Sequence, residues 1–167
     1  MPPKLLLFAA CEKVIIDQNN VFSLISLLQE LRIEIPEPPP DADGKTPIVP
    51  MKWDVVALWT KADADEREAL YQTRFALIDP TGRPSEFEGT ADLVFADKQN
   101  YRVVTTILGF PIRHEGRYVV RLWLHKKGEP KGEPVAEFPI ILNRSRPQGL
   151  RAFPQPAQPS SRSPSAS

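Results

Sequence analysis

The chain has two histidines, His114 and His125, and histidine is the side chain that most readily moves protons or holds a metal near neutral pH. His114 stands beside Glu115, which would pair a base with the carboxylate that orients it. Adjacent residues on an extended chain point to opposite sides, however, so these two are not expected to act together. The histidines are not spaced as metal ligands. We interpret both as solvated residues, His114 in a turn and His125 at the end of a strand.

Two acidic clusters have the residue types of a cation site without its spacing. The stretch "DADG", residues 41–44, resembles the start of a calcium loop, but the third acidic position and the closing glutamate are missing. Residues 61–68 mix four carboxylates with a lysine and an arginine, which is typical of a solvated turn. Phosphate loops, dinucleotide fingerprints and nucleophile elbows do not occur. The sequence therefore predicts no catalytic residue, no metal site and no cofactor, and it disfavours an enzyme.

Cys11 is the only cysteine, and it stands in "KLLLFAACEKVIID", residues 4–17. One thiol excludes an intramolecular disulfide and a cysteine-based zinc site, so we expect a reducing compartment, the cytoplasm. The ending "FAAC" resembles a lipoprotein signal, and lipidation at Cys11 stays open as the alternative. The apolar run is far shorter than the roughly 20 residues that cross a bilayer. We interpret Leu5 to Ile16 as a buried strand and Cys11 as a small residue of the core.

The main binding signal is aromatic and lies in "GRYVVRLWLHKKG". Alternate residues from Tyr118 to Leu124 make a complete apolar inward face, which directs Arg121 and Trp123 outward. A tryptophan beside an arginine is enriched at binding hot spots. The alternative is that the Pro-rich stretch or the segment Val21 to Leu31 covers this face and buries Trp123 within the monomer. We predict Arg121 and Trp123 as partner-binding residues and Tyr118 as a core anchor.

Short strands must position these side chains. The residues from Trp53 to Thr60 alternate with period 2, and the turn "DPTGRP", residues 79–84, joins two further alternating runs into a hairpin. Three more strands are predicted at Arg102 to Leu108, Arg117 to His125 and Val135 to Leu142. Since Pro139 cannot donate to a ladder, the last of these is expected to lie at an edge or to carry a bulge.

Two segments do not follow the strand pattern. Val21 to Leu31, after an asparagine turn at residues 18–20, matches a helical stripe as well as a strand, and the sequence leaves this choice open. Residues 36–50 contain six prolines and are expected to form a long, stiff loop without sheet donors. From residue 144 onward the chain is rich in Arg, Pro and Ser, and we expect a disordered tail.

Length, composition and strand count together predict one all-β domain over residues 1–143, with seven or eight strands in a β-sandwich or small barrel. Lysines and arginines number 21, and aspartates and glutamates also 21. The tail holds four arginines and no acid, so it carries +4 and the domain −4. Because no basic face is evident in this balance, no nucleic-acid partner is expected, and no membrane partner is expected either.

The order of these features resembles an uncharacterised family of small bacterial proteins known as a domain of unknown function. The resemblance covers roughly Leu5 to Asn143 and is carried by "LLLFAACEKVIID", "FSLISLL", "DPTGR", "GFPIRHEGRYVVRLWL" and "EFPIILN". It implies a single immunoglobulin-like antiparallel β-sandwich, in which "FSLISLL" is a strand, and it brings no catalytic residues. The Pro-rich insertion and the Arg/Pro tail depart from the compact form of the family.

The sequence thus favours a non-catalytic protein-interaction or accessory module of the cytoplasm, with a protein partner that it does not identify and an oligomeric state that it leaves open. The first alternative is a small-ligand binding domain that uses the aromatic residues Trp53, Trp59 and Phe110 at one end of the sandwich. The second alternative is a carboxylate-based enzyme. That alternative requires at least one buried acid with a raised pKa inside a cleft.

Overall fold

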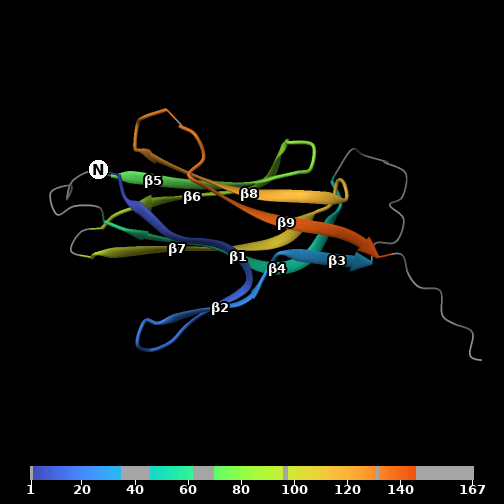
Figure 1. The fold of residues 1–167 in the computed structure, drawn as a ribbon, viewed down its shortest axis with the longest axis horizontal. Coiled ribbons are helices and arrows are strands. Elements are labelled where there is room, and N and C mark those ends of the chain that lie inside the picture. The colour runs from blue at the N-terminus through green and yellow to red at the C-terminus, as the bar shows by residue number, and fades with distance from the viewer. Residues whose placement is uncertain (1, 35–45, 62–69, 96–97, 131, 146–167) are drawn as a thin grey trace, which may run out of the picture.

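Nine β-strands run through the residues that the computed structural model describes, which are 2–34, 46–61, 70–95, 98–130 and 132–145 (Figure 1). In chain order they are β1 (Lys4–Ile16), β2 (Phe22–Leu27), β3 (Glu30–Glu34), β4 (Ile48–Thr60), β5 (Tyr71–Ile78), β6 (Pro84–Leu93), β7 (Asn100–Pro111), β8 (Gly116–Lys126) and β9 (Ala136–Ser145). Within these ranges no helix is long and apolar enough to cross a membrane. The all-β prediction is confirmed, and the predicted strand count of seven or eight is too low.

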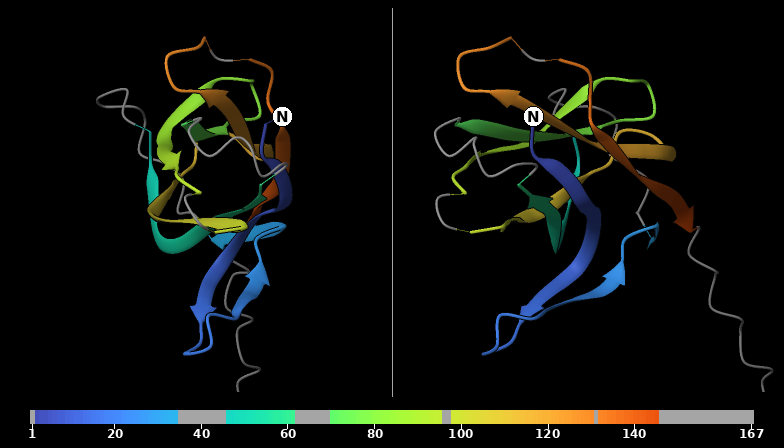
Figure 2. Two further views of the ribbon diagram at one scale, coloured as in Figure 1. Left: turned by 90° about the vertical axis from the view of Figure 1, so that its left-hand side faces the viewer. Right: turned by 60° about the vertical axis from the view of Figure 1, so that its left-hand side comes forward.

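The strands form two sheets that pack face to face as a β-sandwich (Figures 1 and 2). Sheet A has the order β2-β1-β4-β7, and sheet B has the order β3-β9-β8-β5-β6. Neighbouring strands are antiparallel except at one edge, where β3 pairs with β9 in parallel. The prediction of a purely antiparallel sandwich is therefore wrong at this edge.

The core lies between the sheets and follows the period-2 pattern of the strands. Trp53, Val55, Ala57 and Trp59 of β4 point inward, and Tyr118 of β8 faces them from sheet B. Burial of such large aromatic side chains contributes much of the stability of a small domain. The hairpin of β5 and β6 also forms as predicted, and its turn places Gly82 at a φ of 84°, a conformation that glycine adopts without strain.

The segment Val21 to Leu31 forms strands instead of a helix. Asn20, at a φ of 63°, turns the chain, and β2 then pairs antiparallel with β1. Leu28 follows β2, is buried, and donates its backbone N–H to the carbonyl of Ala10 at 2.9 Å. Pairing with β1 and β9 satisfies backbone groups that a helix would have satisfied internally, so tertiary context decides the choice.

Two prolines lie elsewhere than predicted. Pro50 belongs to β4, at the bulge between Val49 and Lys52, and so lies in a strand and not in a loop. Pro139 lies in β9, which runs inside sheet B without a register shift against β8, so the predicted edge strand or bulge is wrong for the strand as a whole. At Pro139 itself, however, β9 has no pairing with β3, which pairs only with Ile141–Ser145. Ile141 donates its backbone N–H toward β3, to the carbonyl of Gln29, so the nitrogen of Pro139, two residues earlier, faces the same side. The sheet tolerates Pro139 because β3 pairs with β9 only from Ile141 onward, and no ladder hydrogen bond is lost.

The domain also extends slightly further than predicted. Because β9 continues to Ser145, Arg144 and Ser145 belong to the sandwich and not to the tail. The remaining tail, residues 146–167, lies outside the described residues, as do residues 35–45 of the Pro-rich stretch with its "DADG" motif and residues 62–69 of the acidic run.

Candidate functional site

Among the residues that the structure describes, two carboxylates are buried, Asp54 and Asp79, and both have structural roles. Asp54 accepts hydrogen bonds from the backbone of Val14 at 2.8 Å and from Thr106 Oγ1 at 2.6 Å, and thereby joins three strands of sheet A. Asp79 closes the β5–β6 turn, where its Oδ1 accepts from Thr81 N, Thr81 Oγ1 and Arg83 N. With these oxygens occupied by structural donors, neither group is presented to a substrate.

The pKa of Asp79 is lowered, the reverse of what the carboxylate-enzyme alternative requires. Partial burial acts to raise this pKa, but the hydrogen bonds from Thr81 and from the backbone of Arg83, together with the charge of Arg113, outweigh burial. Because the folded pKa lies below the unfolded one, the ionised carboxylate stabilises the fold at neutral pH. This contribution begins to be lost below about pH 4 and disappears as the pH falls through the folded pKa.

We therefore expect Asp79→Asn to lower the free energy of unfolding at pH 7 by about 1 kcal/mol, since a charge-assisted acceptor is replaced by a neutral one. The variant should also lose less stability than the wild type on acidification from pH 7 to about pH 3. Urea unfolding at both pH values measures the two effects. An equal acid-induced loss of stability in both proteins would contradict the stabilising role of the ionised Asp79 carboxylate.

Cys11 occupies the core position that the sequence predicts. It lies in β1 between Leu27 of β2 and Asp54 of β4, and it is fully buried. Burial, followed by the charge of Asp54, raises the pKa of the thiol, so the sulfur stays protonated at neutral pH. A buried thiol held between two strands offers no surface for lipidation in this fold.

The histidines lie far from each other in the sandwich. His114 is exposed in the turn before β8, whereas His125 lies near the end of β8, half-buried and opposite Gln72. In the part of the chain that the structure describes, no group of three or more His, Cys, Asp or Glu side chains is placed to hold a metal ion. The backbone of His114 has a structural role, since its carbonyl accepts from the hydroxyl of Tyr118 at 3.0 Å.

Tyr118 is a core anchor, as predicted. It is fully buried, and its hydroxyl also accepts from the backbone of Arg113 at 3.1 Å and of His114 at 3.3 Å. The side chain therefore joins the core to the turn that precedes β8. This fixes the start of the strand that carries Arg121 and Trp123.

The aromatic ligand site proposed from the sequence does not form. Trp53, Trp59 and Phe110 belong to strands β4 and β7, and all three lie in the core with at most 1% of their surface exposed. Trp53 Nε1 donates to the carbonyl of Gly109 at 3.0 Å, and its ring lies 5.8 Å from that of Phe110. The prediction is wrong because the alternation of β4 turns both tryptophans inward.

Arg121 and Trp123 lie together on the outer face of sheet B, and both are half-buried. Arg121 Nε pairs with Glu137 Oε1 of β9 at 2.6 Å. On the other side, the guanidinium of Arg74 from β5 lies 5.9 Å from the centroid of the Trp123 indole. Arg74 also forms an ion pair with Glu88 of β6. We call these five residues the Trp123 face.

The Trp123 face keeps part of its tryptophan accessible because the segment Val21 to Leu31 lies elsewhere. Its first part, β2, belongs to sheet A, and its second part, β3, lies at the far edge of sheet B beyond β9. The alternative in which this segment covers Trp123 is therefore wrong, whereas residues 35–45 of the Pro-rich stretch, the other cover considered, lie outside the described residues. The alternation within β8 predicted the outward position of Arg121 and Trp123. It could not predict that Arg74 lies opposite Trp123, because this depends on the register between β5 and β8.

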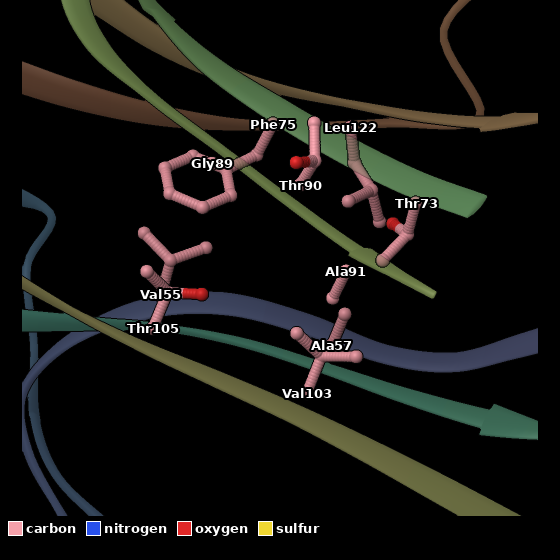
Figure 3. A pocket seen from close by; sticks show the side chains of 10 residues that line it. All are labelled: Val55, Ala57, Thr73, Phe75, Gly89, Thr90, Ala91, Val103, Thr105 and Leu122. Atoms are coloured by element: carbon pink, nitrogen blue, oxygen red, sulfur yellow. The ribbon is translucent and has the colours of Figure 1, made fainter. Parts of the chain in front are cut away.

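The cavity between the sheets is too small for a ligand. Figure 3 shows it among ten largely apolar side chains, including Phe75, Val103 and Leu122, and its volume of about 10 Å³ would hold one water molecule. A larger cleft of about 450 Å³ opens at the turn between β1 and β2. It is lined by Asn20, Phe22, Leu58, Lys98, Asn100, Tyr101 and Arg102.

Arg102 is the central side chain of this cleft. Its guanidinium donates to Asn20 Oδ1 at 2.8 Å and lies 5.1 Å from the centroid of the Phe22 ring. With Lys98 beside it, the cleft holds two cations and no carboxylate among the described residues that line it. Because Asn20 and Arg102 are 82 residues apart, no local motif signals their contact.

No protein-family model matches this chain, and no curated protein matches it. Its function must therefore be inferred from the geometry of its own surfaces. Of these surfaces, the Trp123 face combines a partly exposed tryptophan with two arginines in fixed positions, which is the residue chemistry of a protein-binding site.

Proposed function

We propose that the chain is a non-catalytic protein-interaction module that binds a folded protein partner through the Trp123 face. The observation that carries the proposal is the position of Trp123, half-buried beside the Arg74 guanidinium on an outer sheet face that also carries Arg121. Tryptophan and arginine dominate the energetics of protein interfaces, because they bury a large surface and still offer polar contacts. A tryptophan that is already partly fixed also loses little conformational entropy on binding.

The charges around Trp123 indicate what kind of partner fits. Arg74 pairs with Glu88, and Arg121 pairs with Glu137, so the face has no net charge. Both ion pairs are partly exposed, and such pairs stabilise a fold by less than about 1 kcal/mol each. They hold the two arginines in place on this face, where they form a polar rim. This favours a protein surface of mixed polarity over a polyanion.

We further propose that the sandwich is immunoglobulin-like, and that it belongs to a bacterial protein of the cytoplasm. The Tyr118 hydroxyl, bonded to the backbone four residues upstream near the start of β8, supports the first point, because immunoglobulin-like domains have a tyrosine corner at the equivalent strand. The parallel pairing of β3 with β9 at one edge is compatible with that topology. The single reduced cysteine, buried in β1, favours the cytoplasm.

The test is copurification of the full-length tagged protein from its own cells at moderate salt, beside Trp123→Ala and Ile25→Ala. Ile25 is the matched control, because it is 40% exposed but lies on β2 in the other sheet. We expect a stoichiometric partner with the wild type and with Ile25→Ala, and at least a tenfold loss with Trp123→Ala. Retention of the partner by Trp123→Ala would contradict the proposal.

Tryptophan fluorescence gives a direct readout with the purified partner. Trp53 and Trp59 are 0% and 1% exposed, so only Trp123 can change its contact with water on binding. A blue shift of emission that disappears in Trp123→Ala places the partner on this face.

A second candidate function, the binding of a small anionic ligand, is favoured by the cleft around Arg102. Its volume of about 450 Å³ suits a small molecule, and Lys98 and Arg102 supply positive charge beside two aromatic rings. Calorimetric titration with inorganic phosphate tests it. We expect Arg102→Gln to weaken binding at least tenfold and Arg117→Gln, at an exposed arginine of β8, to leave it unchanged. The absence of heat with the wild type would contradict this candidate.

A further inference from the structure

The outermost strands of the two sheets differ in how well they are protected against pairing with another strand. Four strands lie at sheet edges: β2 and β7 in sheet A, and β3 and β6 in sheet B. An edge strand presents unpaired N–H and C=O groups, and proteins usually block such edges with charges, prolines, short strands or local irregularities. Three of the four edges show these devices.

The protected edges differ in the device that each uses. β6 begins with Pro84 and carries three carboxylates, at Glu86, Glu88 and Asp92. β3 has only five residues, three of them charged. β2 has six residues and is interrupted by Ser26, whose φ of 52° breaks the extended conformation. Each of these edges therefore opposes the addition of a further strand.

The edge of β7 has none of these devices along most of its length. The strand has twelve residues, and its only charged side chain is Arg102. Its central stretch "VVTTIL", residues 103–108, is uncharged and rich in β-branched residues, which is typical of segments that pair readily. Its pairing with β4 is regular from Asn100 to Leu108, and the bulge of β4 comes only beyond that point.

The register shows which backbone groups of β7 face the open edge. Lys61 N donates to the carbonyl of Gln99 at 2.9 Å, and these two residues continue the pairing of Thr60 with Asn100. In an antiparallel ladder, residues alternate between those that bond to the partner strand and those that face away from it. The odd residues of β7 therefore bond to β4, and the even residues direct their N–H and C=O groups outward. These even residues are Arg102, Val104, Thr106 and Leu108.

We propose that this edge is a homodimer interface, in which β7 pairs antiparallel with β7 of a second copy about a two-fold axis at Thr105. In this register Val104 lies opposite Thr106 of the second copy, and Arg102 lies opposite Leu108. The two Arg102 residues are then about 20 Å apart, so no like charges meet. About eight backbone hydrogen bonds form, and the two sheets A become one continuous sheet.

The exposed side chains of β7 favour a second copy over an unrelated strand. Val104 is 37% exposed and Leu108 is 73% exposed, both on the outer face of sheet A. An apolar, uncharged stretch is complementary to itself in an antiparallel two-fold arrangement, whereas a charged partner strand would find no opposite charge along residues 103–108. This interface lies in sheet A and does not depend on the proposed role of the Trp123 face in sheet B.

Sedimentation equilibrium of the full chain, between about 1 and 100 µM, tests the proposal. We expect a mass of twice the 18.8 kDa chain for the wild type. Val104→Lys should raise the dimer dissociation constant at least tenfold, because two lysines then lie in diagonal contact across the axis. Ser23→Lys, on the exposed edge β2 of the same sheet, is the matched control and should remain dimeric.

A charge exchange makes the test specific for this register. Val104→Lys and Val104→Glu should each dimerise at least tenfold more weakly than the wild type when alone, and should form a tighter mixed dimer when combined, since the diagonal pair becomes a lysine and a glutamate. Circular dichroism confirms that each variant is folded. The proposal is overturned if the wild type is a monomer at the highest concentration, if Val104→Lys dimerises as tightly as the wild type, if Ser23→Lys is equally disrupted, or if the mixed variants do not associate.

Discussion

Replacing Trp53 by alanine is expected to lower the free energy of unfolding by about 3 to 5 kcal/mol, the largest effect of any single substitution considered for this domain. Trp53 is fully buried in β4, contacts Phe110, and donates a hydrogen bond from Nε1 to the carbonyl of Gly109. The alanine variant loses this apolar contact, leaves a cavity between the sheets and leaves a buried carbonyl unpaired. A loss of this size approaches the whole stability of many small domains.

Phenylalanine substitutions separate the hydrogen bond from the packing, because the chain offers a matched pair of tryptophans. Trp59 lies six residues further along β4, on the same face of the strand, and is equally buried. Its Nε1, however, has no hydrogen-bond partner among the described residues. Trp53→Phe should therefore cost about 1 kcal/mol more than Trp59→Phe. Urea unfolding of both variants measures the difference. If Trp59→Phe is the more damaging of the two, the hydrogen bond to Gly109 is not the reason for the stability of this site.

The strands were predictable from the sequence where one face of the sheet is buried and the other is not. In β4 and β8 the apolar residues recur at every second position, so the positions of Trp53 and Tyr118 follow from the pattern alone. The turn before β6 was equally predictable, because Asp79, Pro80 and Gly82 each favour the conformation that they adopt. Local chemistry and burial agree in these segments.

Other features required knowledge of which strands become neighbours. Residues 21–31 carry a pattern compatible with a helix, and they become strands because β1 and β9 offer edges to pair with. Pro139 is tolerated inside sheet B because β3 begins to pair with β9 only beyond it. This depends on the register between the two strands and cannot be predicted from the local sequence. The inward position of Phe110 likewise depends on its pairing with Val49 of β4.

The candidate sites show the same division. Arg121 and Trp123 follow from alternation within one strand, whereas Arg74 and Glu88 come from two other strands and meet them through sheet order. The cleft around Arg102 is a contact between segments 82 residues apart. A single sequence gives no measure of such pairings, so only the part of each site that lies on one strand was predictable.

Gly89 of β6 is expected to be sensitive to substitution because of its closeness to one aromatic ring. It lies directly opposite Phe75 of β5, and Figure 3 shows the Phe75 ring lying over it. A Cβ atom at this position would lie 2.3 Å from Cε1 and 2.7 Å from Cζ of that ring. Gly89→Ala should therefore lower the free energy of unfolding by about 1 to 3 kcal/mol, the usual cost of overpacking, and Gly89→Val should lower it further.

The adjoining cavity does not relieve this clash. Its volume of about 10 Å³ is that of one water molecule, so the Phe75 ring, itself 5% exposed, cannot move aside without displacing Leu122 or Val55. A double-mutant cycle with Phe75→Leu tests the cause, because the smaller side chain leaves room for a methyl group at position 89. Gly89→Ala should then lower the free energy of unfolding less in the Phe75→Leu background than in the wild type. A coupling free energy near zero would show that the backbone of β6, and not the Phe75 ring, requires the glycine.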